Sequence, residues 1–311
     1  MARPLRVEYP GALYHVMNRG DRRQAIFRGD ADRYLFLESL QAACEKTGWQ
    51  IHAYCLMPNH FHLIPETPIA NLVAGMKWLL GTYTIRFNRR HQLSGHLFGG
   101  RYKAQLIDES APHYLRIAAD YVHLNPARAA LIDATQKLDS YRWSSYPTYL
   151  QAPKHRPGWL RVDRVLGEHG VQGDNVRGRQ EFRRRIESQR QEGPVPEWNL
   201  LREGWRIGEK DFLSRLAEQF VIETAEHHSG QVRHESEIEK AQRLISEKLA
   251  LVGWDRAQLP KEPKGHPMKI RIAQEMREQS TMSVKWIANE LSIGSWTYLN
   301  KLLCQQRLSN T

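Results

Sequence analysis

The stretch WQIHAYCLMPNHFHLIPETP, residues 49–68, predicts two strands joined by a tight turn. Residues 49–57 are mostly apolar and fit a strand, and Pro58-Asn59 is a typical turn pair. Residues 60–66 fit a second strand that pairs with the first. We expect Pro65 to end this strand early or to mark an edge, because proline cannot donate a ladder hydrogen bond.

The flanking sequence predicts an alternation of strands and helices through residue 150. We expect a strand at 13–18, a helix capped by Asp30 and ended by Gly48, a helix at 69–91, a strand at 101–107, and a helix capped by Ser110 that runs to Leu124 before Asn125-Pro126. The order β-α-β-β-α-β, with one extra helix, is the ferredoxin-like split β-α-β plan. The predicted class is α+β, with an antiparallel sheet and helices on one face.

The remaining residues predict two further regions. Residues 151–264 are highly charged and favour a mostly helical connecting region. Residues 265–311 predict a helix-turn-helix DNA-binding segment with helices at 268–277, 284–291 and 296–303. Ser283 and Ser295 are expected to cap the last two helices. A generic helical hairpin is the alternative, and we expect at least one of Trp296 and Tyr298 to be core.

Composition limits the partners and the compartment. The 311 residues carry 45 Lys and Arg against 34 Asp and Glu, a formal net charge of +11, which favours a polyanion such as nucleic acid. Cys44, Cys55 and Cys304 lack the spacing of a disulfide framework or a zinc site. The sequence contains no signal peptide and no apolar run of membrane-spanning length. We therefore expect a bacterial cytoplasmic protein without a membrane partner.

His60 and His62 are the first candidate site residues. Side chains alternate along a strand, so both imidazoles should lie on one face, with Phe61 on the other. Two adjacent imidazoles form a two-ligand site for a divalent metal. The alternative for an isolated His-x-His pair is that the histidines are ordinary surface or core residues.

The segment DYVHLNP, residues 120–126, supplies the second candidate. Tyr121 and Asn125 are four residues apart and should share one helical face. A tyrosine hydroxyl can attack phosphorus, and an amide oxygen can ligate a cation that assists the attack. Alternatively, Tyr121 packs on the sheet and Asn125 only ends the helix. Tyr114 and His123 are rivals for a catalytic role.

Together, MPNHFHLIPETP and DYVHLNPARAALI resemble the single-tyrosine HUH transposases, in particular the REP-associated tyrosine transposase branch. The resemblance covers roughly residues 2–150. It implies Mg²⁺ or Mn²⁺ held by His60, His62 and Asn125, with Tyr121 as the nucleophile. Related enzymes usually have Gln at the position of Asn125. The resemblance further implies a 5′-phosphotyrosine intermediate on single-stranded or hairpin DNA of REP-like palindromes, formed by a monomer or a homodimer.

Binding of such DNA needs a basic track with aromatic side chains. The candidate DNA-binding residues are Arg19, Arg22, Arg23, Arg86, Arg89, Arg101 and Lys103, joined by Ser295, Thr297, Tyr298 and Lys301 of the recognition helix. Each charge alone is more readily explained as a solvated surface residue than as a phosphate contact. Three other functions remain: a non-catalytic DNA-binding regulator derived from a transposase, a metal-dependent nuclease that activates water, and an RNA hairpin binder.

Overall fold

The computed structural model describes residues 7–111, 113–203, 206–209, 211–212, 214–216, 218 and 237–309. The strands are β1 (Ala12–Arg19), β2 (Gln50–Met57), β3 (His60–Thr67), β4 (Lys103–Ile107) and β5 (Arg206–Ile207). The α-helices up to β5 are α1 (Asp30–Thr47), α2 (Leu72–His91), α3 (His113–His123), α4 (Asn125–Arg128), α5 (Tyr146–Tyr149), α6 (Asp163–Glu168), α7 (Val176–Glu192) and α8 (Leu200–Glu203). The 3-10 turns are η1 (Asp21–Arg23), η2 (Leu138–Ser140), η3 (Pro153–His155) and η4 (Pro196–Asn199). The C-terminal helices are α10 (Glu237–Leu251), α11 (Pro267–Gln279), α12 (Val284–Glu290) and α13 (Trp296–Ser309).

The five strands form one sheet in the order β2-β3-β1-β4-β5. The hairpin of β2 and β3 is confirmed, and β1 lies between β3 and β4, antiparallel to both. The expectation of a purely antiparallel sheet is wrong, because β5 pairs with β4 in parallel. Residues 206–207 lie in the region expected to be mostly helical, and so short a strand leaves no periodic pattern in the sequence.

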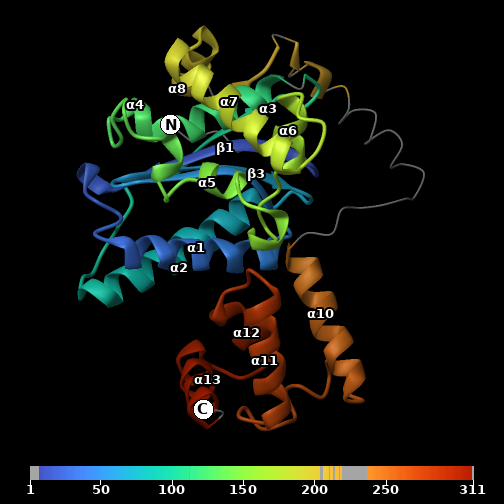
Figure 1. Cartoon of the computed structure of the whole chain (residues 1–311). Coiled ribbons are helices and arrows are strands. Elements are labelled where there is room, and N and C mark those ends of the chain that lie inside the picture. The colour runs from blue at the N-terminus through green and yellow to red at the C-terminus, as the bar shows by residue number, and fades with distance from the viewer. Residues whose placement is uncertain are drawn as a thin grey trace.

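Helices cover both faces of the sheet, which corrects the expectation of helices on one face. In Figure 1, α1 and α2 lie below the sheet, and α3, α6 and α7 lie above it. Phe61 of β3 contacts Phe36 of α1 on the first face. Its neighbour His62 contacts Tyr121 of α3 on the other. Phe61 and His62 thus lie on opposite faces of the sheet, as predicted. The candidate site therefore lies between the sheet and α3.

Two predicted helix caps are wrong. Helix α1 begins at Asp30, but its N-cap is Gly29, and Asp30 makes no capping hydrogen bond. Asp32 instead accepts a hydrogen bond from the backbone N–H of Arg28. Ser110 lies before the start of α3 at His113, and both its N–H and its hydroxyl donate to Asp108. A short polar side chain that finds a partner two residues away forms a local turn instead of a cap.

Pro65 neither ends β3 nor lies at an edge, because β3 continues to Thr67 between two partner strands. A β-bulge at His52 of β2, between the pairs Ile51–Pro65 and Ala53–Ile64, accommodates it. The extra residue relieves the ladder where proline lacks an N–H.

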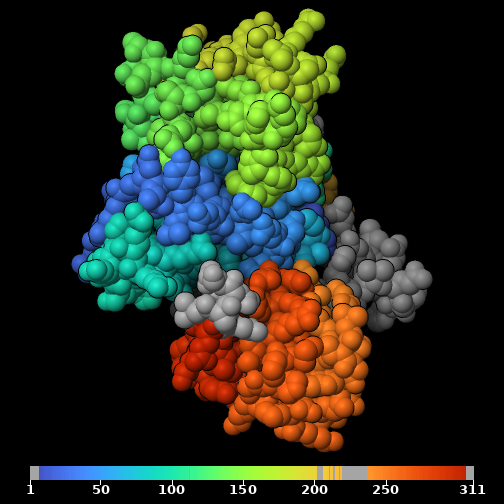
Figure 2. All heavy atoms as spheres, turned by 60° about the horizontal axis from the view of Figure 1, so that its bottom comes forward, coloured from blue at the N-terminus to red at the C-terminus, as the bar shows by residue number. Residues whose placement is uncertain are grey.

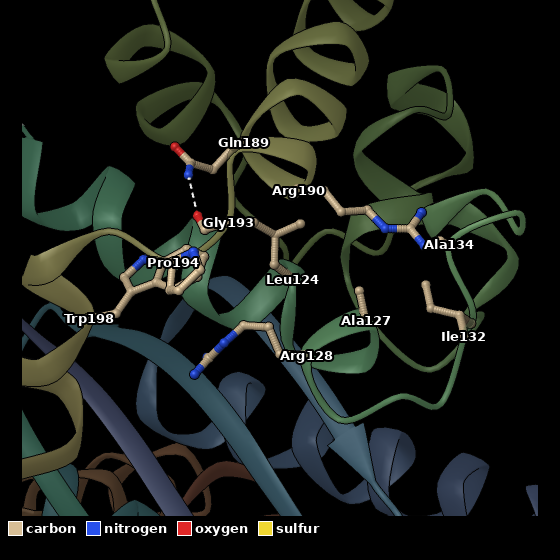
Figure 3. A pocket seen from close by; sticks show the side chains of 10 residues that line it. All are labelled: Leu124, Ala127, Arg128, Ile132, Ala134, Gln189, Arg190, Gly193, Pro194 and Trp198. Atoms are coloured by element: carbon tan, nitrogen blue, oxygen red, sulfur yellow. Dashed lines mark hydrogen bonds between the residues drawn. The ribbon is translucent and has the colours of Figure 1, made fainter.

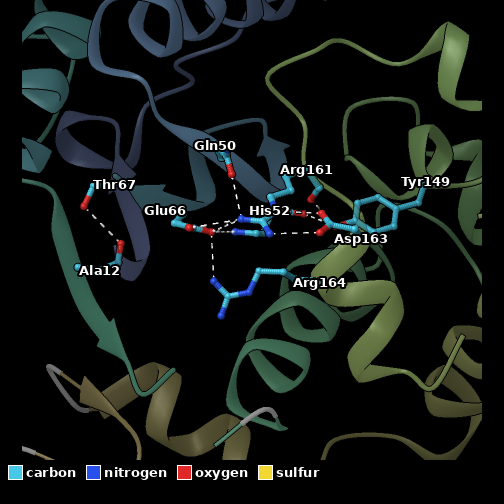
Figure 4. Close-up of polar contacts among 9 residues, drawn as sticks. All are labelled: Ala12, Gln50, His52, Glu66, Thr67, Tyr149, Arg161, Asp163 and Arg164. Atoms are coloured by element: carbon cyan, nitrogen blue, oxygen red, sulfur yellow. Dashed lines mark hydrogen bonds and ion pairs between the residues drawn. The ribbon is translucent and has the colours of Figure 1, made fainter. Parts of the chain in front are cut away.

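The bulge also anchors a later segment of the chain to the sheet. Nε2 of His52 lies 2.8 Å from the carboxylate of Glu66, which also pairs with Arg161 and Arg164, each at 3.1 Å. Figure 4 shows these side chains converging on Glu66. Desolvation opposes ionisation of Glu66, but His52 and the two arginines outweigh it and lower its pKa. These ion pairs hold residues 161–164 against the sheet, at the end of β3 that lies away from His60 and His62.

The described chain has two separate hydrophobic cores. The first core contains residues between Tyr9 and Leu216 and surrounds the sheet. The second core contains residues between Ala241 and Leu303, from the helices α10, α11, α12 and α13. The predicted domain boundaries at residues 150 and 264 stay predictions. None of the described helices has the length and apolar character needed to cross a bilayer.

The three helices predicted near the C-terminus are present as α11, α12 and α13. Ser283 and Ser295 accept hydrogen bonds from the N–H groups of Trp286 and Tyr298, so both predicted caps are confirmed. The apolar residues of the predicted motif, Ile287, Ala288, Leu291, Ile293 and Leu299, are all fully buried. The expectation that Trp296 or Tyr298 is core is wrong, because they are 49% and 40% exposed.

Candidate active site

The candidate site begins with two histidine rings on one face of β3. The ring centroids of His60 and His62 are 5.1 Å apart, as expected for alternate residues of a strand. His62 is buried, whereas His60 at the strand start is half-buried. A third histidine, His15 of β1, stacks on His62 with ring centroids 5.2 Å apart.

Hydrogen bonds decide which nitrogen of each ring carries the proton. Nε2 of Gln105 donates to the carbonyl of Leu200, so its Oε1 faces Nδ1 of His15 at 2.9 Å and accepts a proton from it. Nε2 of neutral His15 is then an acceptor, and Nδ1 of His62, 2.9 Å away, donates to it. Nδ1 of His60 similarly donates to Oδ1 of Asn59 at 2.7 Å. Both His60 and His62 therefore have an unprotonated Nε2.

Burial keeps all three rings neutral near pH 7. Desolvation lowers the pKa of His15 to about 4. Desolvation, followed by the charge of Arg19, lowers the pKa of His60 to about 4. The pKa of His62 is well below its usual value because of burial and then its neighbours His15, His60, Arg128 and Arg19. A neutral imidazole is the form that ligates a metal ion.

Tyr121 lies above these rings. Its ring centroid is 5.7 Å from that of His62 and 5.8 Å from that of His15, both edge-on. The side chain is only 8% exposed, because Trp198 of η4 and Arg128 of α4 pack on it. Tyr121 and His62, which are about sixty positions apart in the sequence, are thus in direct contact.

Asn125 is not on the same regular helix as Tyr121, which corrects the single-helix expectation. Helix α3 ends at His123, and α4 begins at Asn125, with Leu124 in a near-helical conformation between them. Proline at the second position of α4 lacks the N–H that a continuous helix would need. Asn125 is buried, and its Nδ2 has no hydrogen-bond partner among the described residues.

The rivals of Tyr121 have other surroundings. The hydroxyl of Tyr114 donates to the carboxylate of Glu209 at 2.9 Å. His123 is fully buried, with Nε2 2.9 Å from the hydroxyl of Ser145, and its ring packs on Tyr149 and Phe182. The structure therefore brings Tyr121 against His62, whereas the contacts of Tyr114 and His123 are with other residues.

The predicted DNA-binding residues are spread over more than one face. Arg19 and Lys103 lie on strands of the sheet, where Lys103 pairs with Met17, two residue pairs away from His15 and Gln105. Arg86 and Arg89 are exposed on α2, which covers the opposite face. The exposed members elsewhere are Arg22, Arg23, Arg101, Ser295, Thr297, Tyr298 and Lys301. Their DNA contacts stay predictions.

Sequence reasoning missed His15, Arg128 and Trp198. A single histidine in a predicted strand gives no paired signal. Arg128 and Trp198 also line a cavity of about 290 Å³ between α4 and the α7–η4 segment. In Figure 3 the Arg128 side chain passes Trp198 and points toward the strands, away from Arg190. Only the folded chain brings Trp198 to Tyr121.

The predicted metal ligands are two histidines and an asparagine, with no carboxylate among them. The described residues contain no group of three His, Cys, Asp or Glu side chains placed to hold a metal ion. The candidate donors are instead two unprotonated Nε2 atoms and the amide of Asn125, whose nitrogen is buried without a partner. Imidazole nitrogen with amide oxygen is a donor set that divalent ions accept. The donor types present therefore suit a divalent cation.

The chain resembles known proteins over part of its length. One solved structure, described as the REP associates tyrosine transposase bound to a REP hairpin, is 16% identical, covers 53% of this chain and 93% of its own, and gives a TM-score of 0.41. No curated protein matches the chain. The family model for "Transposase IS200 like" matches residues 9–125, which include His60, His62, Tyr121 and Asn125. Residues 9–125 of this chain therefore form an IS200-like Y1 transposase domain.

Proposed function

We propose that this protein is a metal-dependent single-strand DNA endonuclease and strand transferase that uses Tyr121 as its nucleophile. The observation that carries the proposal is the contact of Tyr121 with His62, beside a second histidine whose Nε2 is also unprotonated. A nucleophile next to a cation site is the arrangement that phosphoryl transfer to a side chain needs.

The proposed reaction is a transesterification. The phenol oxygen of Tyr121 forms a bond to phosphorus, and the bond from phosphorus to the 3′-oxygen breaks. The phenol proton leaves to water, and the 3′-oxygen takes a proton from water. The products are a 5′-phosphotyrosine link and a free 3′-OH, which can reverse the reaction without ATP because one ester replaces another.

His60, His62 and Asn125 would hold Mg²⁺ or Mn²⁺. When bound, the ion would draw charge from the phosphate oxygens and so favour attack by a weak nucleophile. The protein contributes a fixed tautomer at each histidine, and Trp198 and Arg128 hold the ring of Tyr121 in place.

For the substrate we propose single-stranded or hairpin DNA of REP-like palindromes. Support comes from the family resemblance, the net charge of +11, and the exposed basic residues near the candidate site. The C-terminal helices would add duplex binding as a helix-turn-helix, with Ser295, Thr297, Tyr298 and Lys301 exposed on or at the start of α13. A monomer or a homodimer is compatible with this proposal.

The test is covalent trapping. The full chain is incubated with Mn²⁺ and single-stranded oligonucleotides that carry the palindromes flanking its gene, then denatured and analysed by mass spectrometry. We expect an adduct on Tyr121 that is lost in Tyr121→Phe, because phenylalanine has no oxygen to attack phosphorus. Tyr114→Phe is the matched control on the same helix and should retain the adduct.

Each other outcome contradicts the proposal in a different way. An adduct in Tyr121→Phe would assign the wrong nucleophile. Cleavage without an adduct would indicate a nuclease that activates water, and binding without cleavage would indicate a DNA-binding regulator. Preferential competition by RNA hairpins would indicate an RNA binder.

A further inference from the structure

Arg128 lies next to the proposed nucleophile. Its guanidinium carbon is 4.2 Å from the ring centroid of Tyr121 and 4.9 Å from that of Trp198. The two rings are themselves 6.0 Å apart and nearly perpendicular, so the guanidinium fits against both. Arginine is held in this way by aromatic faces, which fix its plane without using its N–H donors.

Arg128 lacks the partners that other arginines of this region have. Its Nη1 is buried without a hydrogen-bond partner, and no ion pair of Arg128 is found in the described parts of the chain. Arg190, which lines the same cavity, donates instead to the carbonyls of Gln136 and Asp133. A buried donor without a partner and a charge without a counter-charge are both unfavourable. Arg128 is therefore suited to an anionic ligand.

The anion would lie at the candidate active site. Figure 3 shows the Arg128 side chain pointing toward the strands of the sheet. Tyr121, on whose ring this guanidinium lies, is itself edge-on to His62 with ring centroids 5.7 Å apart. Arg19, whose Nε is also buried without a partner among the described residues, pairs with His60 across the β1–β3 ladder. Arg128 thus adds a positive charge beside Tyr121 and the histidine pair.

We propose that Arg128 is a catalytic residue that binds a non-bridging oxygen of the scissile phosphate while Tyr121 attacks. This inference rests on the proposed function. Negative charge builds on those oxygens as the phenol oxygen approaches, and a guanidinium already fixed by two rings meets it without reorganisation. Its planar, two-pronged donor set matches a phosphate, whereas lysine offers a single point charge.

The first experiment measures the single-turnover rate of adduct formation in Mn²⁺, with the oligonucleotide that the wild-type chain links covalently. Arg128→Gln, which keeps a flat head between the rings, should slow this rate by about a hundredfold. Arg128→Lys keeps the charge and should give an intermediate rate. The matched control is Arg184→Gln on α7, which removes one charge from a side chain that is 75% exposed and should leave the rate unchanged.

The second experiment does not depend on catalysis. Fluorescence anisotropy gives the affinity of each variant for a labelled pool of random single-stranded DNA at increasing salt concentration. Arg128→Gln should reduce the slope of log affinity against log salt by about 0.7, the loss of one phosphate contact, whereas Arg128→Lys and Arg184→Gln should keep it. Circular dichroism checks the fold, and Arg128→Lys serves both experiments if Arg128→Gln does not fold.

The results separate this inference from the proposed function. A wild-type rate together with a wild-type salt slope in Arg128→Gln would overturn the role of Arg128. If that variant does not fold, a wild-type adduct rate in Arg128→Lys would overturn it. If the wild-type chain forms no adduct, the proposed function fails, and the salt slope alone decides whether Arg128 contacts a phosphate.

Discussion

His15 and Gln105 set the protonation pattern of His62 through two consecutive hydrogen bonds. Gln105 accepts from His15, and His15 accepts from His62, so the proton of His62 is confined to Nδ1. Groups that hold a ligand histidine in this way fix its tautomer and orient the ring. His15 is thus a positioning residue, one step removed from the proposed metal ion.

The corresponding prediction concerns metal affinity. His15→Phe keeps a ring stacked on His62 but removes the acceptor, so it should weaken Mn²⁺ binding by roughly 10- to 100-fold in isothermal titration calorimetry. His52→Gln is the control, because His52 is also a buried strand histidine but bonds to Glu66, at the other end of β3. Wild-type Mn²⁺ affinity in His15→Phe would contradict the positioning role.

The residues of the site differ in how far the sequence could predict them. His60 and His62 are predictable because strand geometry alone places alternate side chains together. Tyr121 and Asn125 followed from their spacing, although the break at Leu124 did not. His15 and Trp198 come from distant segments, and Arg128, seven residues after Tyr121, lies beyond the break at Leu124, so all three contacts with Tyr121 depend on the folded chain. No local pattern encodes such contacts, and a single sequence therefore does not reveal them.

At the level of elements, the packing of α2 on the sheet depends on a glycine. A Cβ at Gly75 would lie 2.2 Å from the indole ring of Trp49, which is buried and donates from Nε1 to Asn71 at 2.7 Å. The ring is therefore fixed in the space that a side chain would need. At Gly81, one and a half turns later on the same helix, an added Cβ would meet no atom within 4 Å.

These two glycines give opposite predictions for the same substitution. Gly75→Ala should lower the free energy of unfolding by about 1–3 kcal/mol through overpacking against Trp49. Gly81→Ala should raise it by up to about 1 kcal/mol, because alanine is the better helix former. Urea unfolding followed by circular dichroism measures both. A stabilising effect of Gly75→Ala would show that Trp49 moves and that this contact does not fix the helix.

The predicted β-α-β-β-α-β order is confirmed because each of these elements has its own periodic pattern. The parallel strand β5 was missed since two residues, Arg206 and Ile207, carry no pattern and are selected by β4. The strand with Pro65 was predicted to end early because the compensating bulge lies in the partner strand, at His52. Features that depend on a neighbouring strand are thus not specified by the local sequence.

At the level of the whole molecule, the second core meets the first through the end of α1. Nζ of Lys46 donates to the carbonyls of Arg277 and Glu278 near the C-terminal end of α11. A cation at helix-terminal carbonyls is a favourable contact. Figure 2 shows the C-terminal helices against the side of the molecule formed by α1 and α2. The proposed duplex-binding helices thus lie across the sheet from Tyr121.

This separation predicts a division of labour between cleavage and duplex binding. Helix α10 belongs to the second core. A truncation that removes only residues 265–311 would therefore leave half of that core exposed. We choose to remove residues 237–311, which takes away the whole second core. The shortened chain should still form the covalent adduct on single-stranded DNA, because all the residues around Tyr121 remain. It should bind hairpin DNA more weakly, with a smaller salt slope in fluorescence anisotropy, since phosphate contacts are lost.

The full-length control for the truncation is Lys301→Ala, which removes one exposed charge from α13 and leaves the Lys46 contact intact. It should reduce the salt slope for hairpin DNA by about 1 if Lys301 contacts a phosphate. Loss of adduct formation in a truncated chain that still melts cooperatively would contradict the division. The C-terminal helices would then act on the cleavage step through the end of α1, the element that also packs on Phe61 behind the histidine pair.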